Sequence, residues 1–306
     1  MRHREKLVLE FWDRNRELST KNKDYRNFAH HFLQMLLKQD VGHGDATSSS
    51  LIKGNKNISA AIVAKEDGIF AGLEEFRLLN NDLGIKPLKR DGDRIKAGEI
   101  LIKINGPASK ILERERTNLN LLQRMNGIAT LTNELTKKLG NAKLAATRKT
   151  LWGSIDKKAV SIGKGLTHRI SLNDGILVKD NHLEALEYDF KKVINLVKDK
   201  AKYIEVEVED KKQALNAATA IKNAINSSKS GNLFAIMLDN IKPKKIKPII
   251  KEMKKQELYD YVLLEASGNI NPSNFMEYAN CGADVISMGC ITNSAKALNM
   301  SQEIAK

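Results

Sequence analysis

After about residue 140 the chain alternates between short apolar runs and amphipathic stretches, and this regularity constrains the fold more than any other feature. The apolar runs are 143–147, 175–179, 203–208, 233–238, 261–266 and 284–287. Helical periodicity occupies about 183–201, 210–227, 243–256 and 272–280. Strands that alternate with helices in this way form βα units around a parallel sheet. We therefore expect six strands of an α/β barrel, with room for one or two more between residues 107 and 174.

The N-terminal third has a different pattern. Apolar positions near a 3.6-residue period predict helix over residues 1–40. A small β-rich module follows, in which short alternating stretches are separated by Asp-Gly and Asn-Gly turns. These stretches are 58–63, 68–71 and 100–104. Residues 107–140 lack a strand pattern and predict one long helix, or two helices with a break at Gly127.

The composition is that of an ordinary globular protein. Of the 306 residues, 42% are hydrophobic and 29% are charged, and no apolar run approaches the roughly 20 residues that a bilayer-spanning helix needs. The first forty residues mix charged and apolar positions, so we expect no secretory signal and a cytoplasmic location. Cys281 and Cys290, the two cysteines, predict buried thiols in a reducing compartment rather than a disulfide.

The net charge of +14 admits several kinds of anionic partner. Much of the excess is lysine scattered along predicted helices, where it usually solvates an outer face; examples are Lys191, Lys192, Lys198, Lys200 and Lys202. Aromatic residues make up only 5% and are not interleaved with the basic ones, which disfavours binding to single-stranded nucleic acid.

Polar or glycine clusters follow almost every apolar run at its C-terminal edge. They are Arg148-Lys149, Lys179-Asp180-Asn181-His182, Asp239-Asn240, Ser267-Gly268-Asn269 and Met288-Gly289. The catalytic face of an α/β barrel is formed by the C-terminal ends of its strands. These clusters are therefore expected to converge on one mouth.

The run at 204–209 alternates strictly between apolar residues and glutamates. Glu205, Glu207 and Glu209 consequently share one face of the predicted strand. On an exposed edge strand this would have no functional meaning. In a strand covered on both sides, inward carboxylates are costly unless cations, metal or ligand hydroxyls pair with them.

Five basic residues fall within a short stretch of the chain, and we expect them at the same barrel mouth. They are Arg148, Lys149, His168, Arg169 and Lys179. Their mutual repulsion would destabilise the empty protein unless anions neutralise them, and Arg binds carboxylate and phosphate in a bidentate manner. The expected ligand is therefore polyanionic. Glycine turns after the last two runs would let backbone N–H groups approach a phosphate.

These residues belong to an ordered series of motifs that resembles the quinolinate phosphoribosyltransferases, also called carboxylating nicotinate-nucleotide pyrophosphorylases. The resemblance covers nearly the whole chain from about residue 28. The motifs are Gly42-His43-Gly44-Asp45-Ala46-Thr47, Glu115-Arg116-Thr117, Asn126-Gly127-Ile128-Ala129-Thr130, Thr147-Arg148-Lys149-Thr150, His168-Arg169, Val178-Lys179-Asp180-Asn181-His182, Glu205-Val206-Glu207, Met237-Leu238-Asp239-Asn240, Glu265-Ala266-Ser267-Gly268 and Val285-Ile286-Ser287-Met288-Gly289. Departures from the usual family pattern occur at Ala146, Trp152, Lys164, Thr167 and Asn269.

The resemblance implies an α/β fold with an N-terminal α/β sandwich and an incomplete TIM-like barrel. The sandwich domain would cover residues 1–125, with 292–306 as a segment that could complete it, and the barrel would cover 126–291. It also implies a homodimer, or a hexamer built from such dimers, whose active sites borrow Arg116 from the neighbouring subunit. No nucleic acid or membrane partner is implied.

The resemblance also implies roles for individual residues. Arg116, Arg148, His168, Arg169 and Lys179 would bind the two carboxylates of quinolinate. The remaining substrate-binding residues would be Thr147, Lys149, Glu207, Asp239, Ser267, Gly268, Asn269, Ser287 and Gly289, of which Ser267, Gly268 and Gly289 would seat the 5-phosphate. Lys149, Glu207 and Asp239 would be catalytic, and Glu207 and Asp239 would hold Mg²⁺ directly or through substrate and water.

The implied reaction joins quinolinate to phosphoribosyl pyrophosphate and yields nicotinate mononucleotide, pyrophosphate and CO₂, a step of de novo NAD biosynthesis. Two alternatives stay open at this point. One is a paralogous phosphoribosyltransferase of the same fold that acts on nicotinate or another acidic heterocycle, including the relative linked to molybdate transport. The other, from a different class, is a basic RNA-binding protein.

Overall fold

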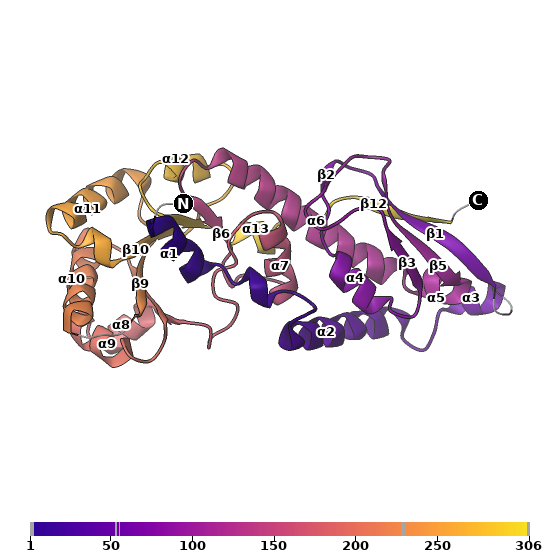
Figure 1. The fold of residues 1–306 in the computed structure, drawn as a ribbon, viewed down its shortest axis with the longest axis horizontal. Helices are drawn as coiled ribbons and strands as arrows, with labels where there is room; N and C mark the ends of the chain where they lie inside the picture. Colours follow the sequence, from indigo (N-terminus) through magenta and orange to yellow (C-terminus); the bar gives the residue numbers. More distant parts are fainter. Residues whose placement is uncertain (1–2, 53, 55, 228–230, 305–306) are drawn as a thin grey trace. The chain divides into compact units, whose positions relative to one another are not determined.

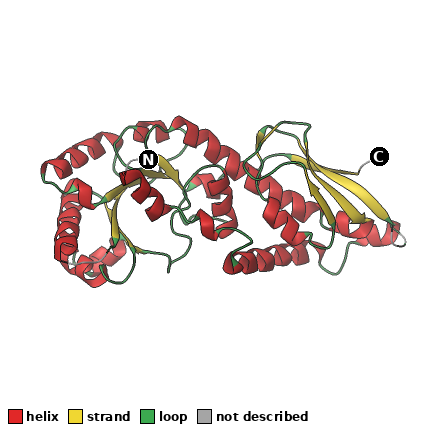
Figure 2. Cartoon of the chain, in the orientation of Figure 1, coloured by secondary structure: helices red, strands yellow, loops and turns green. Residues whose placement is uncertain are grey.

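The computed structural model describes residues 3–52, 54, 56–227 and 231–304 (Figures 1 and 2). It contains two compact units, each discontinuous in sequence. The barrel unit consists of Met1–Arg14, Leu135–Thr150 and Gly165–Cys290, and the sandwich unit consists of Asn15–Glu134, Leu151–Lys164 and Ile291–Lys306. No helix within the described ranges combines the length and apolar character needed to cross a bilayer. The predicted boundary between residues 125 and 126 stays a prediction.

The barrel unit is built on a six-stranded parallel sheet with the order β6-β11-β10-β9-β8-β7. The strands are β6 (Lys143–Ala145), β7 (Ile176–Val178), β8 (Tyr203–Val208), β9 (Leu233–Asp239), β10 (Leu263–Ser267) and β11 (Val285–Ser287). Each one coincides with a predicted apolar run, because strands covered on both faces are apolar throughout. The α/β fold class is confirmed. β8 lies between β7 and β9, so the edge-strand interpretation of the glutamate-rich run is wrong.

Helices connect these strands as the periodicity predicts, with one difference. They are α8 (Asp180–Ala185), α9 (Phe190–Val197), α10 (Lys211–Ser227), α11 (Pro243–Lys255) and α12 (Phe275–Ala279), with a 3₁₀ turn η2 (Tyr259–Tyr261) before β10. The single helix expected over 183–201 is two helices, α8 and α9. Glu187 and Tyr188 adopt positive φ angles between them, and the Asp189 side chain accepts the N–H of Lys192 to begin α9.

The first helix, α1 (His3–Trp12), packs into the barrel unit. Val8, Phe11 and Trp12 are buried in a cluster that also contains Leu263 and Val285, the first residues of β10 and β11. The amino ends of the parallel strands are therefore covered by α1, and their carboxyl ends lie at the opposite edge.

The sandwich unit contains an antiparallel sheet in the order β12-β1-β5-β3. Its strands are β1 (Asn57–Ala64), β3 (Gly84–Pro87), β5 (Ile100–Pro107) and β12 (Met300–Ile304), with a separate ribbon of β2 (Gly68–Ile69) and β4 (Arg94–Ile95). The remaining helical elements are η1 (Asn15–Glu17), α2 (Lys23–Val41), α3 (Ala46–Leu51), α4 (Leu73–Leu79), α5 (Ala108–Glu113), α6 (Glu115–Lys138), α7 (Ser154–Ile162) and α13 (Cys290–Asn293). β12 joins the sheet from the other end of the chain, pairing antiparallel with β1.

Residues 107–140 form two helices, as one of the two alternatives had it, but the break lies at Arg114, between α5 and α6, and α6 runs without interruption through Gly127. A Cβ atom at Gly127 would lie 2.0 Å from the carbonyl oxygen of Lys296 and 3.1 Å from Cα of Ala297. The glycine therefore allows a backbone segment to pack directly on the helix rather than ending it.

Candidate active site

Charged and hydroxyl side chains gather at the carboxyl edge of the parallel sheet. Arg148 and Lys149 follow β6, Lys179 follows β7, Glu207 lies near the end of β8, and Asp239, Ser267 and Ser287 are the last residues of β9, β10 and β11. Because the strands are parallel, their carboxyl ends meet at one edge. The structure therefore brings these seven predicted residues to the same side of the barrel unit.

Four of these residues form a mixed-charge cluster. Nζ of Lys179 lies 2.7 Å from Oε2 of Glu207, whose side chain is largely buried. Burial and the negative charge of Glu207 raise the pKa of Asp239, whereas Lys179 and Lys149 lower it. Two carboxylates and two ammonium groups are thus close enough to influence one another, which suits a site for a cation and an anionic ligand together.

Arg148 and Arg169 form a second, purely cationic group. Burial and the charge of Arg148 lower the pKa of Arg169, so the two guanidinium groups lie close enough to repel. Arg169 also donates from one guanidinium nitrogen to the carbonyl oxygen of Gly175 at 3.0 Å, which fixes its direction. Arg148 is exposed. Paired guanidinium groups of this kind bind carboxylates or phosphates.

The segment that carries Arg169 is anchored on the end of α1. The backbone N–H of His168 donates to the carbonyl oxygen of Trp12 at 2.7 Å, and the N–H of Arg14 donates to Oγ1 of Thr167 at 2.7 Å. His168 itself has a φ of 55°, which is unfavourable for a residue with a side chain. Backbone strain of this kind persists where surrounding contacts enforce it, and it concentrates at functional sites.

The ring of His168 points to two buried carboxylates inside the barrel. Nε2 lies 3.2 Å from Oε2 of Glu265 and 3.3 Å from Oε2 of Glu205, and the ligand atoms of all three residues lie within 4.8 Å of one another. Burial lowers the pKa of His168, but the charges and hydrogen bonds of Glu265 and Glu205 outweigh it and raise the pKa to about 9. Burial and the charge of Glu265 raise the pKa of Glu205 to about 7.

A backbone hydrogen bond places the proton on the His168 ring. The N–H of Arg169 donates to Nδ1 at 2.8 Å, so Nδ1 carries no proton in this arrangement. Nε2 then carries the proton and directs it to the carboxylates. The raised pKa of His168 taken alone would give a doubly protonated ring at neutral pH, but such a ring would lose the Arg169 bond. The geometry instead favours a neutral ring, and the raised pKa of Glu205 lets that carboxyl group hold the additional proton.

A tightly packed glycine turn follows β10. Gly268 has a φ of 92°, and a Cβ atom there would lie 2.4 Å from Oδ1 and 2.5 Å from the backbone N of Asn240. The Asn240 N–H donates to the Ser267 carbonyl oxygen at 3.0 Å, and Nδ2 of Asn269 donates to Oδ1 of Asn240 at 3.0 Å. On the neighbouring strand β11, Oγ of Ser287 is buried without a hydrogen-bond partner among the described residues, and Gly289 lies just beyond that strand.

Three predicted residues have different surroundings. The ring of His168 is buried against Glu205 and Glu265, and its predicted contact with a substrate carboxylate stays a prediction. Oγ1 of Thr147 accepts the N–H of Lys149 at 3.1 Å, so it shapes the loop after β6. Arg116 is exposed in the first turn of α6, in the sandwich unit. Its participation in a shared active site stays a prediction.

Sequence reasoning assigned no role to Glu265. The sequence nevertheless marks it, because Glu265 is the third residue of the mostly apolar strand β10, as Glu205 is the third residue of β8. Both are almost fully buried, at 0% and 2% exposure. A charged residue inside a predicted buried strand thus identifies a member of the site.

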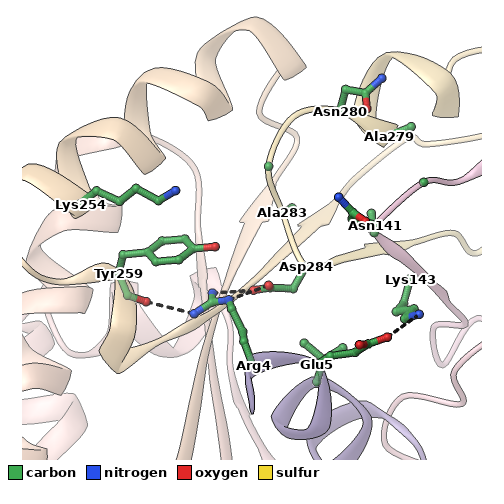
Figure 3. A pocket seen from close by; sticks show the side chains of 14 residues that line it. Arg4, Glu5, Asn141, Lys143, Lys254, Tyr259, Ala279, Asn280, Ala283 and Asp284 are labelled. Carbon is green, nitrogen blue, oxygen red and sulfur yellow. Dashed lines mark hydrogen bonds and ion pairs between the residues drawn. The ribbon is translucent and has the colours of Figure 1, made fainter. Parts of the chain in front are cut away.

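A cavity of about 650 Å³ lies near the amino ends of β6 and β11 (Figure 3). Its charged side chains are mostly paired with one another. The guanidinium of Arg4 donates to both carboxylate oxygens of Asp284, at 2.7 and 2.6 Å, and Lys143 lies 3.3 Å from Glu5 (Figure 3). These pairs hold α1 against the strands, and we assign them a structural role.

Two family models match this chain. The C-terminal domain of quinolinate phosphoribosyl transferase matches residues 128–303, and the N-terminal domain of the same family matches residues 45–126.

Individual proteins agree with these matches. A probable nicotinate-nucleotide pyrophosphorylase (carboxylating) of Methanothermobacter thermautotrophicus is 37% identical over 283 residues, covering 89% of this chain and 97% of that protein. A protein of the same description from Bacillus subtilis is 35% identical over 87% of this chain and 90% of its own length. The solved nicotinate-nucleotide pyrophosphorylase of Francisella tularensis superposes with a TM-score of 0.78 at 28% identity, covering 91% of this chain and 96% of that one.

Proposed function

The chain belongs to the quinolinate phosphoribosyltransferase family, and from that premise we propose how its residues perform the family reaction. The enzyme is a carboxylating nicotinate-nucleotide pyrophosphorylase, a pentosyltransferase of de novo NAD biosynthesis. Ribose 5-phosphate passes from phosphoribosyl pyrophosphate to the ring nitrogen of quinolinate, and pyrophosphate and CO₂ leave. The observation that supports the residue assignment best is the mixed-charge cluster of Lys149, Lys179, Glu207 and Asp239 beside the Arg148–Arg169 pair.

Arg148, Arg169 and Lys179 bind the two carboxylates of quinolinate in this proposal. The repulsion between the two guanidinium groups is relieved when a dianion lies between them, so the empty site favours such a ligand. Bidentate contacts also fix the ring plane, which aligns the ring nitrogen with the ribose carbon that it attacks. Arg116 of a second copy would complete this pocket in a homodimer.

The phosphoribosyl group lies along the ends of β8 to β11 in this proposal. Glu207 and Asp239 accept hydrogen bonds from the ribose hydroxyls and support the positive charge that develops on the sugar. Lys149 faces the departing pyrophosphate. The backbone after β10 and β11, with Ser267, Gly268, Asn269, Ser287 and Gly289, donates to the 5-phosphate, and the unpartnered hydroxyl of Ser287 supplies one donor.

Glu207 and Asp239 also suit Mg²⁺, which prefers one or two carboxylates and leaves its other positions to water and substrate phosphate. The raised pKa of Asp239 fits this, because a carboxylate destabilised by burial and a like charge gains from a cation. When bound, Mg²⁺ would neutralise charge on the pyrophosphate leaving group. When Mg²⁺ is absent, the ammonium group of Lys179 neutralises the carboxylate of Glu207.

Decarboxylation needs no covalent nucleophile from the protein. Once the ring nitrogen is alkylated, it withdraws the electron pair released when the adjacent carbon–carbon bond breaks, and a proton then replaces CO₂ on the ring. Arg148, Arg169 and Lys179 hold the carboxylate that remains. We further propose that the enzyme acts as a homodimer in the cytoplasm, where its two free thiols stay reduced.

The test is incubation of the purified full chain with quinolinate, phosphoribosyl pyrophosphate and Mg²⁺. We expect equimolar CO₂ and nicotinate mononucleotide. A parallel reaction with nicotinate, which has no second carboxylate to lose, separates this function from that of a paralogue. Turnover of nicotinate but not of quinolinate would contradict the proposal.

A further inference from the structure

The segment Thr167–Arg169 is held from both sides, by α1 and by two carboxylates inside the barrel. We infer that Glu205 and Glu265 are positioning residues: they hold the His168 ring, and through it the backbone of Arg169, in the geometry that receives a substrate carboxylate. The inference rests on the proposed role of Arg169 and assigns Glu205 and Glu265 a part in binding that acts through other residues.

Glu205 and Glu265 come from β8 and β10, which are separated in the sheet by β9. Residues from alternate strands fill the same interior layer of an α/β barrel, which explains how one ring contacts both. Oε1 of Glu205 and both oxygens of Glu265 lack a hydrogen bond of good geometry among the described residues. Buried carboxylates in this state are costly for stability, so a purely structural role accounts for them poorly.

The backbone of His168 requires such support. Its φ of 55° lies in the left-handed region, where a side chain is disfavoured, and the strained peptide directly precedes Arg169. One side of the segment is fixed by the bonds to Trp12 and Arg14. The other side is fixed only if the ring stays where Nδ1 accepts the Arg169 N–H and Nε2 faces the glutamates.

This arrangement also assigns a role to the N-terminal helix. The apolar face of α1 is buried at the amino ends of the strands, and its last turn presents the Trp12 carbonyl to His168. Helix α1 thus holds the segment Thr167–Arg169 on one side, and the two carboxylates hold it on the other. The guanidinium group of Arg169 is held in turn by a hydrogen bond to the carbonyl oxygen of Gly175.

Substitutions that separate hydrogen bonding from charge test the inference. Glu265→Met keeps the length of the side chain and removes the oxygen that lies 3.2 Å from Nε2 of His168, whereas Glu265→Gln keeps an oxygen there and removes the charge. We expect Glu265→Met to raise the KM for quinolinate tenfold or more, with the KM for phosphoribosyl pyrophosphate within twofold of wild type. We expect Glu265→Gln to keep both KM values within threefold. The matching pair at Glu205 should behave alike.

Two kinetic outcomes overturn the inference. One is a folded Glu265→Met variant, verified by its circular dichroism spectrum and melting temperature, with an unchanged KM for quinolinate. The other is a Gln variant as impaired as the Met variant, since that would assign the effect to charge alone.

A spectroscopic measurement keeps the inference separate from the proposed function. In ¹⁵N-labelled wild-type protein, the ring of His168, assigned by its absence from His168→Gln, should show a protonated Nε2 and an unprotonated Nδ1. Glu265→Met should shift the Nε2 signal and Glu265→Gln should shift it less. A proton on Nδ1 in the wild type overturns the inference whether or not quinolinate is turned over, whereas the expected spectrum without turnover contradicts only the proposed function.

Discussion

The ammonium group of Lys179 lies 2.7 Å from the carboxylate of Glu207, which joins the cationic and acidic parts of the candidate site. Lys179 directly follows β7, and Glu207 lies near the end of the neighbouring parallel strand β8. In the proposed reaction Lys179 contacts a substrate carboxylate while Glu207 contacts ribose and Mg²⁺. The pair therefore lies where the two substrates meet.

Replacement of Lys179 by Met should raise the KM for quinolinate about 10- to 100-fold, because a hydrogen bond to a charged group contributes about 1.5–3 kcal/mol. Steady-state kinetics measures the change. Lys191→Met, at an exposed position of α9, is the matched control and should resemble wild type. Equal KM values for the two variants would contradict the proposal that Lys179 binds quinolinate.

Replacement of Arg148 by Ala should abolish turnover of quinolinate while the melting temperature stays within a few degrees of wild type. The side chain is exposed, so it contributes little to packing, whereas its bidentate contact with a carboxylate cannot be replaced. Arg148→Lys should recover only a small part of the activity. Wild-type turnover by Arg148→Ala would refute the assigned role.

Replacement of Gly268 by Ala should impair binding of phosphoribosyl pyrophosphate and lower stability by about 1–3 kcal/mol. The added Cβ would lie 2.5 Å from the backbone N of Asn240, at a φ of 92°. Gly98→Ala is the matched control, since its φ is 87° but nothing lies within 4 Å of the new Cβ. Urea unfolding and the two KM values should show a larger effect at Gly268; equal effects would mean that strain alone matters.

We expect Asp91 to make the stability of the sandwich unit depend on pH. Burial and the charge of Glu75 raise the pKa of Asp91 to about 6, although its carboxylate accepts the N–H groups of Gly72 and Leu73. The carboxyl group of Asp91 therefore binds its proton more tightly in the folded state than in the unfolded chain. Its contribution to the free energy of unfolding is fully present below about pH 4 and is lost as pH rises through about 6.

Asp91→Asn should remove this dependence, since the amide oxygen can still accept a hydrogen bond and no charge is buried. We expect the variant to be about 1–3 kcal/mol more stable than wild type at pH 8, with the difference vanishing near pH 4. Urea unfolding at several pH values measures it. A difference that is constant with pH would show that Asp91 ionises freely in the folded protein.

Most of the barrel could be predicted from the sequence because buried parallel strands leave a simple signal. All six apolar runs became β6 to β11, and the helices α10 and α11 lie where the periodicity predicts them. Short, partly exposed strands leave no such signal: β3, β4 and β12 were not predicted. β12 is a strand because it pairs with β1 from the other end of the chain, a contact that local residue patterns do not encode.

The sequence by itself determined which chemistry this protein carries, because the order of apolar runs and the charged residues that end them place Arg148, Lys179, Glu207 and Asp239 at one sheet edge. The tertiary structure alone decided what holds the segment of Arg169 in place. Strand order and register bring Glu205 and Glu265 to one imidazole ring, and the Trp12 carbonyl at the end of α1 accepts the N–H of His168, whose backbone is strained. Contacts between residues distant in sequence depend on how the sheet curves and closes, which no local pattern specifies.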